Sequence, residues 1–368
     1  MTEIGLISIA SSLGFVFFEP TFGYISDRIG RKKILFGATL VSGATTFFYT
    51  MVTSFWHFLP ISFFSTAVFS GVVVTRRAFI ADVMGSSERG KRYGTYMAWF
   101  TLGEVAGPFL GGYLAEITNH ITPFYVSCLI MLLSAVIVLL IKEVRLDDSM
   151  GVNDVYSRKN VEKVSPTKSH SSLRLVTSGF VMFLITRMLQ SFVGFFLRSI
   201  LPIFAKESEE LNATESQIGL MMSIVSVTRV PLQLVFGDLA DRIGRKLLIT
   251  LGALFGGLTF FGFQTISSIP QLYTMRTLYG VCAVSFNLAM MIYLIDCIPR
   301  EKYGIAMGLY GLSEDVGGML GPLIIAFFYD NQGFTASVYC VSGVMLLGAV
   351  TSMVSFKRFK SIPAPSTS

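Results

Sequence analysis

Residues 23–32 read Gly-Tyr-Ile-Ser-Asp-Arg-Ile-Gly-Arg-Lys, and residues 237–246 read Gly-Asp-Leu-Ala-Asp-Arg-Ile-Gly-Arg-Lys. The two decapeptides lie 214 residues apart, and the same offset relates Asp82 to Asp296 and Gly107-Pro108 to Gly321-Pro322. A constant offset over this length indicates two copies of one structural unit. The sequence therefore predicts a tandem duplication.

Each decapeptide lies between long apolar runs. Charged residues make up 14% of the chain and hydrophobic residues 52%, whereas soluble domains contain about 25% charged residues. A soluble helix needs a polar face, and runs such as 34–53 have almost none. We therefore predict an all-α polytopic membrane protein, with spans at residues 4–25, 34–53, 57–80, 93–114, 122–141, 174–204, 217–239, 247–266, 270–295, 304–328 and 335–356.

The repeat divides the chain into three parts. Residues 1–141 form an N-terminal bundle, residues 142–172 a polar linker, and residues 173–368 a C-terminal bundle. The counterparts of residues 173–217 would precede Met1, so the first copy has five spans and the second has six. We expect either a reading frame that begins upstream or a truncated copy.

Basic residues indicate the orientation. The linker, the C-terminal tail and the connections on the same side hold 24 of the 29 lysines and arginines. Basic loops face the cytoplasm by the positive-inside rule. We therefore predict a multi-pass plasma-membrane protein whose linker and C-terminus are cytoplasmic. The cytoplasmic loops then account for the net charge of +6, which gives no support for nucleic-acid binding.

The two decapeptides resemble the loops between helices two and three and between helices eight and nine of the major facilitator superfamily. The resemblance covers essentially the whole chain. It implies twelve helices in two six-helix bundles, of which eleven are visible here and the first is absent. It also implies secondary active transport through a central cavity that opens alternately to each side of the membrane.

The repeated turns carry a candidate gate. We expect Arg31 to pair with Asp82 and Arg245 with Asp296, because the repeat relates the two pairs. The resemblance implies that such pairs hold the cytoplasmic gate shut in one state. The motif positions are Gly23, Asp27, Arg28, Gly30, Arg31 and Asp82, and in the second copy Gly237, Asp241, Arg242, Gly244, Arg245 and Asp296.

A second motif lies in the fourth span, at Gly94, Gly103, Gly107, Pro108, Gly111 and Gly112. It is similar to the fifth-helix motif of proton-coupled antiporters of the superfamily, mostly drug exporters. The second copy has Ile325-Ala326 in place of the closing glycines. Glycines at these spacings lie near one helix face and allow close packing. The alternative to an antiporter motif is that these glycines form a packing feature that many transporters share.

Ionisable side chains within spans are costly and usually functional. Glu104 and Arg229 lie at similar depths, on helices that meet between the bundles in this family, so we predict an ion pair. It is equally consistent with a structural tie and with a coupling role. Glu19 either ties to Arg76 or Arg77 or carries a proton in the cavity.

A polar stripe runs along the sixth span. Helical periodicity places Arg187, Gln190, Ser191, Gly194 and Arg198 on one face. The resemblance implies that this helix lines the cavity, which makes the stripe a candidate substrate surface. Arg198 could instead extend to the outer interface. Glu314 and Asp315 could balance the arginines or carry the coupled proton.

The sequence shows no nucleophile–base constellation, phosphate loop or metal-ligand cluster. We expect no enzyme, cofactor or metal site. The favoured function is a monomeric, proton-coupled exporter of small amphiphilic or drug-like molecules, with the substrate, protons and the bilayer as partners. One alternative is a proton-coupled uptake transporter for a metabolite anion. The other is a non-transporting relic or sensor.

Overall fold

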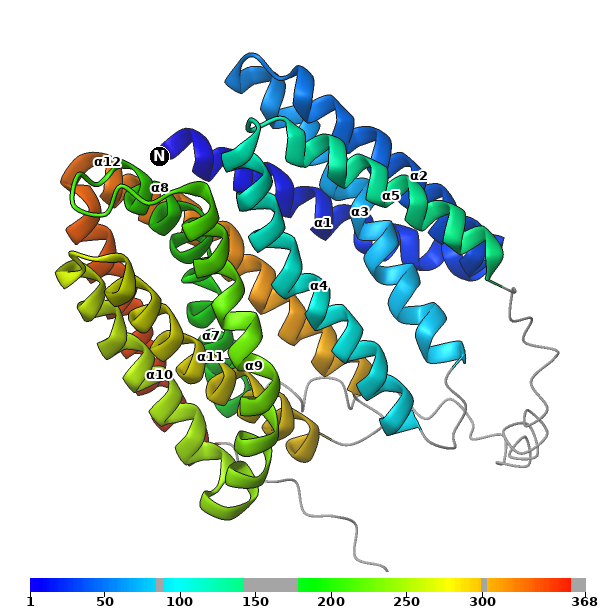
Figure 1. Ribbon diagram of the computed structural model, residues 1–368. Coiled ribbons are helices and arrows are strands. Elements are labelled where there is room, and N and C mark those ends of the chain that lie inside the picture. Colours follow the sequence, from blue (N-terminus) through cyan, green and yellow to red (C-terminus); the bar gives the residue numbers. More distant parts are fainter. Residues whose placement is uncertain (84–88, 142–177, 299–302, 359–368) are drawn as a thin grey trace, which may run out of the picture.

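The computed structural model describes residues 1–83, 89–141, 178–298 and 303–358. Within these ranges the chain is helical, with short turns and no strand, and the predicted all-α class is confirmed (Figure 1). The predicted linker at 142–172 lies outside the described residues.

Five helices precede the linker: α1 (Thr2–Ile29), α2 (Arg31–Phe48), α3 (Phe55–Val83), α4 (Arg89–Ile117) and α5 (Thr122–Leu140). After it, α7 (Ser178–Phe192), the π-helical segment η4 (Phe196–Ile200) and α8 (Leu201–Glu207) follow one another along the predicted sixth span. The remaining helices are α9 (Glu215–Ile243), α10 (Arg245–Gly262), α11 (Ile269–Cys297) and α12 (Tyr303–Arg358). One 3₁₀ turn follows α2 (Tyr49–Met51) and another follows α10 (Phe263–Thr265).

The long element α12 contains two helices. Gly333 interrupts it with φ 83° and ψ −173°, so the two parts correspond to the predicted spans 304–328 and 335–356. Eight helices in the described part of the chain are long and apolar enough to cross a membrane, with α12 counted once. The helices α4 and α9, which carry Glu104 and Arg229, are not among the eight.

Single glycines make the two repeated turns. Gly30 joins α1 to α2 with φ 107°, and Gly244 joins α9 to α10 with φ 90°. Side chains with a Cβ atom are strained at these φ values, whereas glycine is not. The repeat therefore preserves a residue that each turn requires. We call the end of the molecule with these turns the loop end, and the end where α1 and α9 begin the far end.

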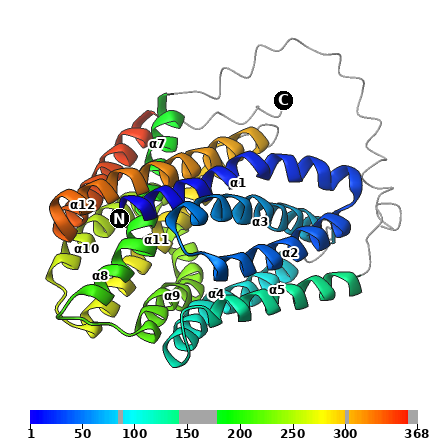
Figure 2. The same ribbon diagram turned by 90° about the horizontal axis from the view of Figure 1, so that it is seen from above.

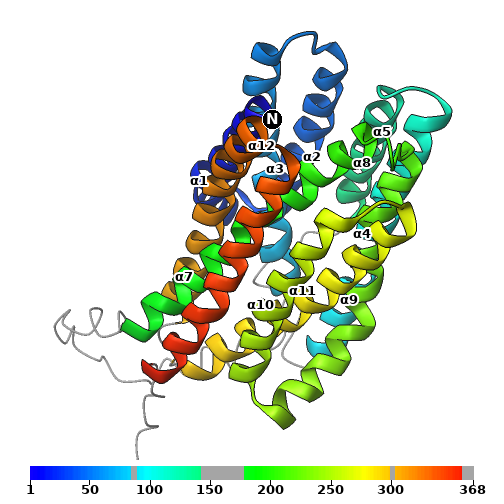
Figure 3. The ribbon, with the colours of Figure 1, turned by 90° about the vertical axis from the view of Figure 1, so that its left-hand side faces the viewer.

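The two bundles differ in how much apolar surface they bury within the described chain. The C-terminal bundle has two large buried clusters, with fully buried phenylalanines such as Phe196, Phe260 and Phe286. Its helices face the viewer in Figure 3. The N-terminal bundle buries one small cluster around Leu35 and Val72. Outward apolar side chains, such as Leu140 at 78% exposure, suit contact with lipid.

The bundles are in contact at the far end. The backbone N–H of Thr2 on α1 donates to Asp330 on α12 at 2.8 Å, and α4 packs against α9. In Figure 1, α4 and α9 lie side by side near the start of α1 and diverge toward the loop end. Figure 2 shows α1 beside α12 and α4 beside α9, where helices of the two bundles meet.

Glycine allows the close approach of α4 and α9. A Cβ atom added to Gly112 would lie 2.2 Å from the carbonyl oxygen of Glu215, and one added to Gly219 would lie 2.4 Å from that of Pro108. The two backbones are therefore in direct contact at two points. This contact closes the space between the bundles at the far end.

Candidate functional site

A cavity lies between the bundles. Three chambers, of about 510, 460 and 390 Å³, share Gly194 and Arg198 and are therefore parts of one space. A fourth chamber of about 680 Å³ lies between α1, α3 and α12, and shares Glu314 and Asp315 with the 390 Å³ chamber. Volumes of about 300–1,000 Å³ are typical of sites for small molecules.

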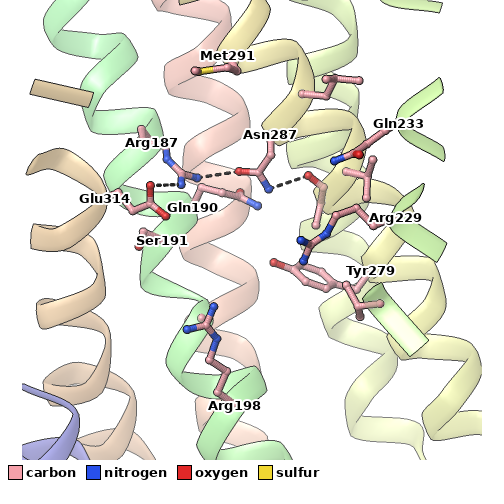
Figure 4. Close-up of a pocket in the computed structure, with 15 residues that line it drawn as sticks. Arg187, Gln190, Ser191, Arg198, Arg229, Gln233, Tyr279, Asn287, Met291 and Glu314 are labelled. Atoms are coloured by element: carbon pink, nitrogen blue, oxygen red, sulfur yellow. Dashed lines mark hydrogen bonds and ion pairs between the residues drawn. The ribbon is translucent and has the colours of Figure 1, made fainter. Parts of the chain in front are cut away.

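The polar stripe on α7 and η4 faces this cavity. All five of its members, Arg187, Gln190, Ser191, Gly194 and Arg198, line the 510 Å³ chamber (Figure 4). Eleven residues rotate a helix by about three turns, so the first and last arginines lie on the same face. The placement predicted from the helical periodicity is thus present, whereas the alternative placement of Arg198 at the outer interface is not.

Arg187 is held by three partners. One guanidinium nitrogen lies 2.5 Å from a carboxylate oxygen of Glu314 on α12, and another donates to the side-chain oxygen of Asn287 on α11 at 2.8 Å. Its guanidinium also lies 5.0 Å from the ring centre of Tyr310. Figure 4 shows Arg187 between Glu314 and Asn287. The pair ties α7 to α12 and neutralises one positive charge of the stripe.

A second ion pair joins the two bundles. Arg229 on α9 donates to Glu104 on α4 at 2.8 Å, which is the contact expected from their equal depths. The side chains are 36% and 33% exposed, so the pair faces the cavity and is partly screened. Its position between bundles means that separating α4 from α9 at this level breaks it.

Two further carboxylates have different surroundings. Glu19 lies 3.5 Å from Arg77 on α3, within the N-terminal bundle, and its predicted tie is therefore present. Asp315 lines the 390 and 680 Å³ chambers. No ion pair or hydrogen bond links it to any residue that the structure describes. It therefore remains a candidate for proton exchange, whereas Glu19 and Glu314 have basic partners.

Sequence reasoning missed several cavity residues, including three polar ones on α11. Tyr279, Asn287 and Arg276 come from α11, and Arg276 lines the 460 Å³ chamber beside Tyr279. Arg276 is visible in the sequence as a charge within a span, but no partner or cavity role is assigned to it there. Its spacing from Tyr279 and Asn287 places all three near one helix face, which is the signal that could have identified them.

Comparison with known proteins identifies the family. The model of the Major Facilitator Superfamily matches residues 1–201 and, a second time, residues 180–368. The chain belongs to the major facilitator superfamily. Together the two matches cover the whole chain, and the protein is therefore a multi-pass membrane transporter of this superfamily.

The curated relatives include efflux pumps. The chain is 26% identical to an MFS-type transporter of Methanocaldococcus jannaschii, over 97% of this chain and 89% of the relative. It is 24% identical to the multi-drug resistance efflux pump PmrA of Streptococcus pneumoniae, over 97% and 87%. Identity to the multidrug resistance protein MdtG of Escherichia coli is 26%, over 95% and 84%.

Solved structures show the same fold at low sequence identity. The nucleoside transporter NupG has a TM-score of 0.76 and 13% identity, and the alignment covers 96% of this chain and 91% of NupG. A bacterial homologue of the human lysosomal transporter Spinster, in an inward-facing and occupied conformation, also has a TM-score of 0.76, with 14% identity and coverage of 99% and 91%. The predicted major facilitator fold is thus confirmed.

The superfamily loop motif is described in part. The backbones of Gly30 and Gly244 form the two turns, and Arg28 and Arg242 are exposed at the loop end. Arg28 stacks over Tyr24 at 4.4 Å. The side chains of the four motif aspartates lie outside the described residues: Asp27, Asp82, Asp241 and Asp296. The expected pairs of Arg31 with Asp82 and of Arg245 with Asp296 therefore remain predictions.

The glycines of the antiporter-like motif on α4 differ in whether another helix packs against them. A Cβ atom on Gly103, Gly107 or Gly111 would meet no atom within 4 Å, whereas one on Gly112 would overlap α9. Gly94 lies among the residues whose surroundings are not described. Close packing by this motif thus concentrates at its far-end glycine and at the carbonyl of Pro108.

Proposed function

We propose that this protein is a secondary active transporter that exports small amphiphilic or drug-like molecules from the cytoplasm in exchange for protons. The observation that carries the proposal is a cavity between two bundles, lined by charges of both signs and closed by direct helix contact at one end. The resemblance of the α4 motif to the antiporter motif supports the direction of transport, as does the similarity to the efflux pump PmrA and the multidrug resistance protein MdtG.

The proposed orientation follows from the basic residues. With the loop end in the cytoplasm, the cavity of this conformation is closed toward the outside. Alternating access then requires α4 and α9 to separate at the far end while the loop end closes. The motif pairs of Arg31 with Asp82 and Arg245 with Asp296, together with Asp27 and Asp241, are proposed to hold that second state.

We propose Asp315 as the carboxylate that exchanges the coupled proton. It lines the cavity, and among the described residues it has no basic partner that would keep it ionised at all times. Glu314 is the second candidate, because release of Arg187 would expose its carboxylate to the cavity. Neither side chain needs a metal or cofactor for this role.

The function is tested in inside-out membrane vesicles with an imposed proton gradient. A fluorescent amphiphilic cation and a fluorescent amphiphilic anion are both offered, and the wild-type protein is expected to accumulate at least one of them when the gradient is present. Asp315→Asn is expected to abolish the dependence on the gradient while leaving substrate binding. Absence of gradient-dependent movement of both dyes would contradict proton-coupled export.

Uptake of a metabolite anion is the second candidate function, because Arg187 and Arg198 line the cavity. Transport in right-side-out proteoliposomes distinguishes uptake from export. Accumulation of the anion inside, together with inward proton flow, supports uptake. Movement of the anion or dye outward, opposite to the proton flow, supports export.

A further inference from the structure

Arg276 is a buried guanidinium without a carboxylate among the residues that the structure describes. The residue is 6% exposed, and its Nε and Nη1 atoms have no hydrogen-bond partner. The remaining nitrogen, Nη2, lies 3.8 Å from the sulfur of Met222, which is a weak acceptor. A buried charge in this state is strongly unfavourable unless an anion compensates it.

Arg198 lies beside the same space. It belongs to the π-helical segment η4 and is exposed to all three connected chambers. Single π-helical turns occur frequently at functional sites. No ion pair links Arg198 to a carboxylate in the described part of the chain, and Figure 4 shows its side chain away from the Arg187–Glu314 pair. Arg198 and Arg276 both line the 460 Å³ chamber, so their positive charges face one space.

The surroundings of the two arginines suit an amphiphilic ligand. The 460 Å³ chamber that both line has apolar walls from Leu197, Met222 and Val225. Among the described residues, Glu104 supplies the one carboxylate in this chamber, and it is paired with Arg229 at 2.8 Å. That pair leaves Arg198 and Arg276 as the two positive charges in the chamber that no described carboxylate balances.

We propose that Arg198 and Arg276 form a subsite for an anionic group, such as a carboxylate, sulfonate or phosphate, of a small soluble transported molecule. The apolar body of that molecule packs against Leu197, Met222 and Val225. Two guanidinium groups offer planar pairs of N–H donors that match carboxylate and phosphate oxygens. The inference rests on the proposed function, because it takes the cavity as the place where the transported molecule binds, and it holds for either direction of transport.

The subsite lies at the closed end of the cavity. Arg276 is seven residues from the start of α11, and Met222 is seven residues from the start of α9. Both are therefore about 10 Å from the far end at 1.5 Å per residue. A molecule that enters from the loop end passes the paired charges of Arg187 and Arg229 before it reaches the unbalanced ones.

The test is equilibrium dialysis of the full-length protein in an uncharged detergent, with 2-naphthoate and its neutral analogue 2-naphthamide as probes. Hydrogen bonds to a charged group predict that the anion binds at least about tenfold more tightly than the amide. Arg276→Gln and Arg198→Gln should each remove most of this preference and leave the affinity for the amide unchanged. Arg276→Lys should retain part of it.

Lys206→Gln is the control, because it removes one positive charge outside the cavity, where Lys206 pairs with Glu215. It should bind 2-naphthoate like the wild type. Equal affinity for the two probes, no binding of 2-naphthoate, or an unchanged preference in both arginine variants would overturn the proposal. Displacement of 2-naphthoate by phosphatidylglycerol would contradict a small soluble ligand and indicate a lipid headgroup.

Because dialysis needs no membrane gradient, its failure can be distinguished from failure of the proposed function. Gradient-driven dye movement without a preference for the anion contradicts the subsite alone. A preference for the anion without any transport contradicts the exporter alone. Arg198 faces the cavity, so Arg198→Gln keeps the test decisive if Arg276→Gln does not fold.

Discussion

Arginines at two depths of the cavity differ in whether a carboxylate pairs with them. At the middle level, Arg187 and Arg229 lie 2.5 and 2.8 Å from the carboxylates of Glu314 and Glu104. At the closed level, next to the far end, Arg198 and Arg276 have no carboxylate partner within the described chain. The same residue type therefore serves as a tie between helices at one level and is left uncompensated at the other.

This difference in pairing indicates a different role for the arginines at each level. An ion pair that joins two bundles stabilises one arrangement of them and must break when they move apart. The buried guanidinium of Arg276 has no carboxylate partner in the described chain, so its desolvation is not offset and it does not stabilise the protein without a ligand. No described acceptor uses its Nε and Nη1 donors, which is why the closed level is the proposed place for an anionic group.

The largest effect is expected at the contact that closes the far end. Gly112→Ala places a Cβ atom 2.2 Å from the carbonyl oxygen of Glu215, so α4 and α9 cannot approach to their present distance. Overpacking of about 1–3 kcal/mol predicts a transport rate in proteoliposomes reduced about five- to 150-fold.

Gly111→Ala is the matched control, since the neighbouring glycine has no atom within 4 Å of an added Cβ. It should transport at close to the wild-type rate. Equal loss in the two variants would show that the closed level does not depend on contact at Gly112.

Arg276→Leu is expected to stabilise the empty protein. It replaces an uncompensated buried charge with an apolar side chain, which predicts a gain of about 1–3 kcal/mol and a higher melting temperature in detergent. Arg187→Leu is the comparison at the middle level, and it should lower the melting temperature because Arg187 has partners in Glu314 and Asn287. A loss of stability in both variants would remove the distinction between the two levels.

The pair of Glu104 and Arg229 is suited to a double-mutant cycle. Because each side chain is about one-third exposed, solvent screening limits the expected coupling energy to about 1 kcal/mol. Glu104→Gln and Arg229→Gln should each lower the melting temperature, and the double variant should lose less than the sum. Strict additivity in the double variant would mean that the 2.8 Å contact contributes nothing to stability.

The smallest effect is expected at Glu116, near the far-end terminus of α4. The backbone N–H of Ser216 donates to its carboxylate at 2.9 Å, and hydrogen bonds from Ser216 hold the pKa of Glu116 below its usual value. A carboxyl whose pKa is lower in the folded state contributes stability above its ordinary pKa, and this contribution is lost as pH falls through the folded-state value.

Thermal unfolding of the wild type and Glu116→Gln from pH 7 to pH 3 measures this contribution. The wild type should be slightly more stable at pH 7, and the difference should vanish at the acidic end. A difference that stays constant across the range would assign it to another cause.

Most of the helices, and part of the cavity, could be predicted from the sequence. Counting residues from the ends of two helices predicts the pair of Glu104 and Arg229, because an α-helix rises by a constant distance per residue. The helical period predicts the stripe from Arg187 to Arg198 in the same way. Both predictions depend only on geometry within single helices, apart from the expectation of which helices meet.

The choice between Glu314 and Asp315 as partner of Arg187 could not be predicted. Adjacent residues on a helix differ in direction by about 100°, and the rotation of α12 against α7 decides which carboxylate meets the guanidinium. The uncompensated state of Arg276 is a property of all its neighbours together. It becomes visible only when α9, α11 and η4 are placed around it.

The duplication, the succession of apolar helices and the glycines of the two turns are all apparent in the amino-acid sequence, because each depends on residues that are neighbours along the chain. The closed end of the cavity, and which arginines find carboxylates, become apparent only in the folded chain. Those outcomes depend on the rotation and translation of whole helices against one another, and no local pattern of residues specifies them.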